Sequence, residues 1–261
     1  MYTFNGGALE SVSKTFPHPH TMRILSWDIG TKTLSYCLLE VTPTDGTPRV
    51  DIHEWESIDV RKEAGLGDKA KPTMREDCEY VIQAVSARAE TLWGYALDHI
   101  SIEQQPAGGR NMFSSVRMKV VSHALHAYFF AQQLGSDRRV PVTFVSPSSK
   151  LVGLDFHESE EDAAARQAGD RKTMGAKYRA NKRHAVECTQ RCLQEMEGEL
   201  AHRARVTFAG AIGKQDDLSD AFMLGYAFCK KALEPKPKRR KVQTSTSMSS
   251  GRSATSSESV S

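Results

Sequence analysis

The segment Lys214-Gln-Asp-Asp-Leu-Ser-Asp-Ala-Phe222 places three carboxylates at the start of an otherwise apolar stretch near the end of the chain. If residues 216–230 form a helix, Asp217 and Asp220 share one face at a spacing of three, and Asp216 and Asp220 share a face at a spacing of four. Acidic side chains beside a core repel one another, and burial increases that cost. A bound cation would offset the repulsion.

A purely structural explanation is available for two of these acids. Asp216 can be the N-cap of the helix, and Asp217 can complement the positive end of the helix dipole. Asp220 lies past the first backbone donors and beside two apolar residues, so capping does not explain it. The choice depends on whether partners exist elsewhere in the chain.

Composition favours an intracellular globular protein. The 261 residues, 39% of them hydrophobic, suffice for one substantial core. No apolar run approaches the roughly 18 residues of a membrane span, so no membrane partner is expected. Residues 1–21 lack the apolar region of a signal peptide and are expected to form a flexible arm.

Cysteine usage does not indicate a disulfide framework. The five cysteines are scattered and include no CxxC pair. His184, Cys188 and Cys192 would share a helical face and could hold zinc, although buried thiols on a packed face are commoner.

The net charge of +3 comes from the end of the chain. Residues 234–261 hold six basic and two acidic residues, which leaves the rest of the chain at −1. The run from Lys236 to Lys241 is typical of a nuclear-import signal, with nonspecific nucleic-acid contact as the alternative. A Ser/Thr-rich stretch follows, and we expect residues 234–261 to be a disordered tail in a nuclear protein, or one that acts at a viral replication site in a eukaryotic cell.

Residues 22–233 carry the pattern of one α/β domain. Three antiparallel strands are predicted at residues 22–27, 34–41 and 50–60, the first two joined by the tight turn Asp28-Ile-Gly-Thr-Lys-Thr33. A capping box at Thr73-Met-Arg-Glu76 begins a helix whose inner side is formed by Val81, Val85, Ala89, Leu92 and Ala96.

The second half alternates strands and helices. A short strand at residues 99–103 ends in Glu103, and a Pro- and Gly-containing segment separates it from a helix at residues 114–133. A strand at residues 142–145, a loop at 146–174 and a basic helix at 176–197 precede the acidic helix.

Asp28 and Glu103 each stand where a strand ends. If the first and fourth strands are neighbours, these carboxylates lie side by side, and the acidic helix can bring Asp217 and Asp220 to the same place. The element order is that of an RNase H-like fold, an α/β fold with a mixed five-stranded sheet and helices on both faces.

Five segments together resemble the Holliday junction resolvases of this superfamily, most closely the poxvirus type, which is related to bacterial RuvC and the fungal mitochondrial resolvases. They are Ile24-Leu-Ser-Trp-Asp-Ile-Gly-Thr-Lys-Thr-Leu-Ser-Tyr-Cys-Leu-Leu39, Ser101-Ile-Glu-Gln-Gln-Pro106, Val145-Ser-Pro-Ser-Ser-Lys150, Lys177-Tyr-Arg-Ala-Asn-Lys-Arg183 and Lys214-Gln-Asp-Asp-Leu-Ser-Asp-Ala221. Two features depart from the pattern: the long tail and a polar insert at about residues 154–175.

The resemblance implies a structure-selective endonuclease that resolves four-way DNA junctions as a homodimer. It carries over Asp28, Glu103, Asp217 and Asp220 as catalytic metal ligands and leaves Asp216 as an N-cap or support. Hard oxygen ligands suit Mg²⁺, with Mn²⁺ as a substitute, and two ions can activate water and stabilise the leaving oxygen.

An acidic site needs basic surroundings to bind DNA, and such contacts make affinity salt-dependent. The candidates are Lys150, Lys177, Arg179, Lys182, Arg183 and Lys214, together with Arg110, Arg117 and Lys119. Lys150 and Lys214 could instead stabilise charge at the scissile phosphate or simply be solvated surface residues. Phe113 could be a wedge at the junction centre or could pack locally.

Three other functions are compatible with parts of the sequence. An actin-like or sugar-kinase ATPase shares the first Asp-x-Gly turn but needs a second one, which this sequence lacks. An RNase H or single-strand nuclease would use the same acids on another substrate. A junction-binding protein that does not cut would tolerate the loss of an acid, whereas all four acids are present.

Overall fold

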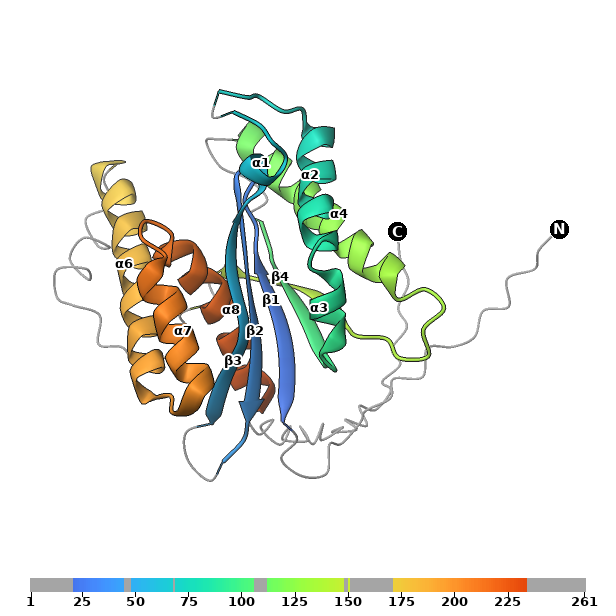
Figure 1. Ribbon diagram of the computed structural model, residues 1–261. Coiled ribbons are helices and arrows are strands. Elements are labelled where there is room, and N and C mark those ends of the chain that lie inside the picture. Colours follow the sequence, from blue (N-terminus) through green and yellow to red (C-terminus); the bar gives the residue numbers. More distant parts are fainter. Residues whose placement is uncertain are drawn as a thin grey trace, which may run out of the picture.

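The computed structural model describes residues 21–44, 48–67, 69–105, 112–147, 150 and 171–233, without the side chains of 112–114 and 171–179. The predicted arm, apart from Thr21, and the predicted tail lie outside this part, as does most of the polar insert. The described residues form a five-stranded sheet with helices on both faces (Figure 1), as predicted.

The strand order is β3-β2-β1-β4-β5. Strands β1 (Met22–Asp28), β2 (Thr33–Thr42) and β3 (Arg49–Asp59) form an antiparallel meander. Strand β4 (His99–Glu103) pairs parallel to β1, and β5 (Val142–Val145) pairs parallel to β4. The predicted third strand begins and ends one residue too late; it ends at Asp59, because Asp59 accepts a hydrogen bond from Lys62 N and caps the short helix α1 (Val60–Glu63).

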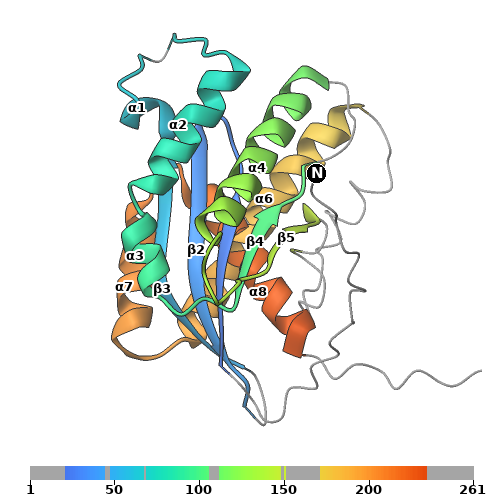
Figure 2. The ribbon, with the colours of Figure 1, turned by 90° about the vertical axis from the view of Figure 1, so that its right-hand side faces the viewer.

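Alternating side chains of the strands supply two cores, one on each face of the sheet. Leu25 and Trp27 of β1 belong to one core, whereas Ile24 of the same strand belongs to the other. Helices α2 (Met74–Ser86), α3 (Ala89–Gly94) and α4 (Met112–Gln132) cover the first face. Helices α6 (Arg171–Glu195), α7 (Gly198–Gly210) and α8 (Gln215–Leu233) cover the second face; Figure 1 shows the sheet between the two layers, and Figure 2 looks onto the first layer.

The helix predicted after Thr73 is interrupted in the structure. Its capping box is confirmed, since Thr73 Oγ1 accepts from Glu76 N and Glu76 accepts from Thr73 N. The break falls at Arg88, whose guanidinium contacts Glu56 at 2.6 Å and Glu63 at 2.7 Å and donates to Ala84 O. The break therefore coincides with ion pairs to carboxylates of two other elements, β3 and α1, which the local helical pattern does not reveal.

Two further helix predictions are corrected. Helix α6 begins at Arg171, so residues 171–174 are not loop; Gly175 lies inside the helix, where glycine costs only about 1 kcal/mol relative to alanine. Helix α7 was not predicted, because its apolar side is narrow. Ala201, Ala204 and Phe208 are nevertheless buried, and Phe208 stacks on Trp55 of β3 at 5.3 Å between ring centroids.

Helix α8 approaches the sheet closely through Gly225. A Cβ atom at this position would lie 2.7 Å from Leu39 Cδ1 and 2.7 Å from Ser26 Oγ. Ser26 Oγ in turn donates to Ala221 O at 2.7 Å and contacts Cys37 O at 3.1 Å, tying α8 to β1 and β2. This packing fixes the height of α8 above the strand that ends in Asp28.

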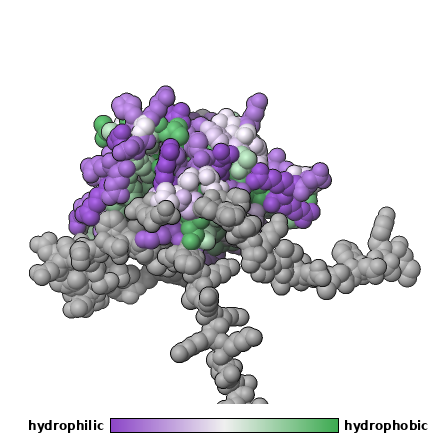
Figure 3. Space-filling view, turned by 90° about the horizontal axis from the view of Figure 1, so that it is seen from below, coloured by the Kyte–Doolittle hydropathy of each residue, from purple (hydrophilic) through white to green (hydrophobic). Residues whose placement is uncertain are grey.

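The end of the sheet at which β1 and β4 begin is mainly hydrophilic where its described residues are visible (Figure 3). A hollow of about 760 Å³ lies at this end, with Arg49, Asp51, Glu195, Glu197 and Tyr226 among its lining residues. It lies far from the predicted carboxylates, so size alone does not identify the candidate site.

None of the helices in the described part of the chain is long and apolar enough to cross a bilayer.

Candidate active site

Asp28 and Glu103 lie side by side because β1 and β4 are parallel neighbours. Trp27 pairs with Ile102, so the next residue of each strand emerges at the same edge of the sheet. The turn after Asp28 is tight: a Cβ atom on Gly30 would lie 2.3 Å from Thr33 O, so glycine is required there. The predicted adjacency of these two carboxylates is confirmed.

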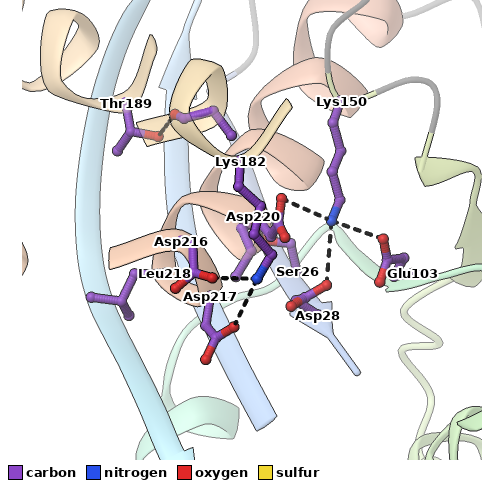
Figure 4. A network of polar contacts seen from close by, with 12 residues as sticks. Ser26, Asp28, Glu103, Lys150, Lys182, Thr189, Asp216, Asp217, Leu218 and Asp220 are labelled. Atoms are coloured by element: carbon purple, nitrogen blue, oxygen red, sulfur yellow. Dashed lines mark hydrogen bonds and ion pairs between the residues drawn. The ribbon is translucent and has the colours of Figure 1, made fainter. Parts of the chain in front are cut away.

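The first turns of α8 bring the remaining acids to this edge (Figure 4). Asp216 and Asp217 lie in the first turn, and Asp220 follows one turn later. Trp55 Nε1 donates to Leu218 O at 3.0 Å and anchors this end of the helix to β3. Residues from β1, β4 and α8 therefore form one acidic cluster.

Lys150 lies at the centre of this cluster rather than on the surface. Its Nζ is 2.8 Å from Glu103 Oε1, 3.3 Å from Asp28 Oδ1 and 3.3 Å from Asp220 Oδ1, and its side chain is 8% exposed. The interpretation of Lys150 as a solvated surface residue is wrong. Three carboxylates surround the ammonium because their mutual repulsion requires a positive charge at that point.

The close contacts shift the pKa values of these groups. Burial, followed by the charge of Asp28, raises the pKa of Glu103 to about 8. Burial also acts to raise the pKa of Asp28, but the Lys150 ammonium and a hydrogen bond with Glu103 outweigh it and hold that pKa below its usual value. Burial would lower the pKa of Lys150, yet the three carboxylates raise it above its ordinary value. Of the two strand-end acids, Glu103 is therefore the weaker one.

A second lysine pairs with the first turn of α8. Lys182 Nζ of α6 makes a close ion pair with Asp216 Oδ2 and lies 4.0 Å from Asp217 Oδ1. Burial, followed by the charges of Asp216 and Asp28, raises the pKa of Asp217 to about 6. Asp216 therefore holds α6, and Asp217 lies close enough to Asp28 for the two charges to interact; the choice of Asp217 over Asp216 as a ligand stays a prediction.

The pKa of Asp220 is also raised, by burial, although Lys150 partly counters the effect.

The other basic candidates have different surroundings. Lys214 Nζ donates to Thr33 Oγ1 at 3.0 Å beside the cluster, and Arg183 is exposed on α6. Arg117 is a structural residue, because it pairs with the buried Asp77 and donates to Pro72 O. Lys119 is half-buried on α4. The side chains of Lys177, Arg179 and Phe113, and all of Arg110, lie outside the described part.

The donor chemistry of the cluster fits a hard divalent cation. Three carboxylate oxygens from separate elements already converge on one positive charge, the Lys150 ammonium, and no sulfur or imidazole is among them. As they stand, no three His, Cys, Asp or Glu side chains in the described residues are placed to hold a metal ion. The acids would have to close around an ion in place of the lysine.

The alternative zinc site on α6 is not supported. Cys188 is buried in the core under α6, and burial raises the pKa of its thiol to about 12. Burial likewise raises the pKa of Cys192 to about 11. Among the described residues no three His, Cys, Asp or Glu side chains are placed to hold a metal ion, and this includes His184, Cys188 and Cys192.

Two contacts to the cluster were missed in the sequence. Gln105 Nε2 donates to Glu103 Oε2 at 3.2 Å; Gln105 belongs to one of the resolvase-like segments, but the sequence assigns it no role. The position of Lys150 at the centre was also missed. The position of Lys150 could have been predicted because it follows the end of β5 by five residues, and β5 runs parallel to β4 and ends at the same edge of the sheet.

Comparison with known proteins places this geometry in context. The yeast mitochondrial Holliday junction resolvase Ydc2 has a similar structure, with a TM-score of 0.51 at 16% identity, covering 83% of this chain and 89% of that one. At this identity the likeness shows the fold. A search of curated proteins found no significant match.

Two other solved structures are more distant. Fowlpox virus resolvase in complex with Holliday junction DNA has a TM-score of 0.44 at 16% identity, covering 82% of this chain and 100% of that one. RuvC of T. thermophilus in complex with a Holliday junction substrate has a TM-score of 0.44 at 11% identity, covering 81% and 95%.

A family model described as mitochondrial resolvase Ydc2 / RNA splicing MRS1 (catalytic domain of Ydc2) matches residues 24–209. The match includes Asp28, Glu103, Lys150 and Lys182 and ends shortly before the acids of α8. It spans well over half of the chain and bears out the resemblance to junction resolvases. The chain therefore belongs to the family of the mitochondrial resolvase Ydc2 and the RNA-splicing protein MRS1.

Proposed function

We propose that the chain is a structure-selective endonuclease that resolves four-way DNA junctions by metal-dependent hydrolysis of a phosphodiester. The observation that carries this proposal is the convergence of Asp28, Glu103 and Asp220 on one cationic point, with Asp217 beside them. Buried carboxylates of separate elements would not be gathered for stability alone, because each adds to the repulsion. A nuclease in this resolvase family accounts for the arrangement.

In this proposal Asp28, Glu103, Asp217 and Asp220 hold Mg²⁺, or Mn²⁺ in its place. When bound, two such ions supply an activated water and stabilise the leaving 3′ oxygen. Gln105 orients the Glu103 carboxyl through its hydrogen bond. Asp216 keeps α6 against α8 through Lys182, so that the acids of α8 keep their position.

Basic side chains around the acids would bind the DNA backbone. Lys214 lies just before α8 and donates to Thr33, beside the cluster, and Arg183 is exposed on α6 next to Lys182 in the sequence, so both are candidates. Contacts to phosphates position the duplex arms without reading sequence, which suits recognition of branched shape. We expect affinity for a junction to fall steeply as salt rises.

The experiment that tests this function compares substrates. The full chain with Mg²⁺ is incubated with a synthetic four-way junction, a linear duplex, an RNA–DNA hybrid and a structured RNA. Paired symmetric nicks in the junction alone are expected. Cleavage of the hybrid alone would favour an RNase H. Binding of RNA without cleavage of any substrate would favour a function in RNA splicing, which the description of the family also names.

Symmetric cleavage requires two active sites, and we propose that α4 forms the face of a homodimer. Val116, Val120 and Phe130 are exposed at 43%, 39% and 53% on this helix, and Leu134 just after it is exposed at 62%. His123 and Ala127 between them are also exposed, so these positions form one stripe at helical spacing. The helix has no acidic residue. A second copy of the same apolar stripe is a self-complementary partner, and a two-fold axis would pair the two stripes.

The dimer is tested by light scattering on the wild type, Val120→Glu and Val206→Glu. Val206 is a matched control, because it is exposed at 58% on α7, on the other face of the sheet. The wild type and Val206→Glu should be dimers, and Val120→Glu should be monomeric. Equal masses for all three proteins would contradict the assignment of the interface to α4.

Location is a separate proposal. The basic run from Lys236 to Lys241 would engage the nuclear import machinery and direct the chain to the nucleus. Deletion of these six residues in a fluorescently tagged chain should abolish nuclear accumulation. Unchanged nuclear accumulation, or accumulation in mitochondria, would contradict this proposal without affecting the catalytic one.

A further inference from the structure

The lysine at the centre of the acidic cluster occupies the place where the carboxylate oxygens converge. Its Nζ lies within 3.3 Å of one oxygen each of Asp28, Glu103 and Asp220. The side chain is 8% exposed, so solvent screens these interactions only weakly. Lys182 pairs with Asp216 and lies 4.0 Å from Asp217, and Lys214 donates to Thr33, so neither lysine contacts these three oxygens as Lys150 does.

We propose that Lys150 is an internal counter-ion that competes with divalent metal for these three carboxylates. The lysine holds the acids together in the metal-free protein, and metal enters by displacing its ammonium. This inference rests on the proposed function, because it takes the acids as metal ligands.

Competition follows from the coordination chemistry. A protonated lysine has three donors and no lone pair, so it cannot join a ligand shell. Mg²⁺ requires oxygens at about 2.0–2.1 Å in an octahedron, which leaves no room for an ammonium among the same oxygens. The flexible four-carbon stem of lysine lets the charged group leave without a shift of the backbone.

The competition predicts the direction in which metal affinity changes when Lys150 is replaced. Replacing a positively charged residue near a metal site ordinarily raises the affinity for metal only a little, because solvent screens its charge. Here the ammonium contacts the ligand oxygens themselves, so its removal should tighten metal binding even as it leaves the acids without a counter-charge. A lysine that supported metal binding would give the opposite sign.

Isothermal titration calorimetry of the full-length protein with MnCl₂, after removal of bound metal, measures the affinity for Mn²⁺ and tests the proposal. Lys150→Met should bind Mn²⁺ more tightly than the wild type by about tenfold or more, within the range of roughly 5- to 150-fold for linked binding equilibria. Lys150→Gln keeps an N–H donor for the carboxylates and should change affinity in the same direction. Lys231→Met removes an exposed lysine of the last turn of α8, away from the cluster, and it should stay within about threefold of the wild type because of solvent screening.

Thermal unfolding gives a second readout. In EDTA, Lys150→Met should melt below the wild type because three carboxylates lose their counter-charge, and Mn²⁺ should raise its melting temperature more than that of the wild type.

Each outcome has one meaning. Equal Mn²⁺ affinity in the wild type and both Lys150 variants would overturn the competition and leave the proposed nuclease standing. Weaker binding in both variants would overturn it as well, by showing that Lys150 supports the metal site. If no protein binds Mn²⁺, the inference and the metal dependence of the proposed function both fail.

Discussion

The replacement of Gly225 by alanine tests whether the close packing of α8 on the sheet sets the position of the carboxylates. The added methyl would lie 2.7 Å from Leu39 Cδ1 and from Ser26 Oγ, whereas apolar contacts are favourable at about 3.5–4.0 Å. Leu39 is fully buried, and Ser26 Oγ is held by hydrogen bonds to Cys37 O and Ala221 O. Neither group can turn aside cheaply, so α8 must move outward by about 1 Å.

The stability loss can be worked from two opposing effects. Overpacking of a core costs about 1–3 kcal/mol, and alanine in place of a helical glycine returns up to about 1 kcal/mol. We therefore expect the free energy of unfolding to fall by about 1–2 kcal/mol. Urea denaturation by linear extrapolation measures it.

The same shift should impair cleavage more than stability. Asp217 and Asp220 lie on the helix that moves, whereas Asp28 and Glu103 stay with the sheet. A misplacement of about 1 Å in an active site can cost roughly 100-fold in rate, and single-turnover cleavage of a junction should show a loss of that order.

Gly210→Ala is the control, because no atom lies within 4 Å of the added methyl. It should leave cleavage unchanged. If Gly225→Ala matches Gly210→Ala in both stability and cleavage, the packing argument is refuted.

Two further predictions concern the support of the sheet. Burial lowers the pKa of His99 to about 4, so the folded protein disfavours protonation of this imidazole. The stability contributed by the neutral His99 is therefore fully present above about pH 6.5 and is lost as the pH falls towards 4. In urea titrations at pH 7 and pH 5 the wild type should lose more stability than His99→Asn; equal losses would contradict the buried neutral histidine. Trp55→Phe removes the hydrogen bond to Leu218 O and should cost about 1 kcal/mol in the same assay, and an unchanged value would show that this bond does not hold α8.

Local patterns in the sequence were sufficient for the sheet and for three elements of the site. Strand β1 alternates side chains between two cores and ends in Asp28, and β4 ends in Glu103, so periodicity and position predicted both acids. The acids of α8 stood out because carboxylates are rare beside a buried face. Each of these signals is contained within a few residues of its own acid.

Tertiary contacts could not be predicted in this way. Arg88 breaks a helical pattern because Glu56 and Glu63 lie on other elements. Helix α7 is stabilised by the stacking of Phe208 on Trp55, which its own sequence does not reveal. Lysine is usually a surface residue. Lys150 is a buried counter-ion only because the ends of β1 and β4 and the first turns of α8 converge around it.

Cleavage and binding of a four-way junction by Asp28→Asn test most directly whether the acids serve catalysis. Asp137→Asn is the matched control, because Asp137 is exposed in the segment between α4 and β5, at the opposite end of the sheet. With Mg²⁺, the wild type and Asp137→Asn should give paired symmetric nicks, whereas Asp28→Asn should bind the junction and leave it intact. Cleavage by Asp28→Asn at the wild-type rate, or binding without cleavage by the wild type itself, would contradict the catalytic role of the cluster.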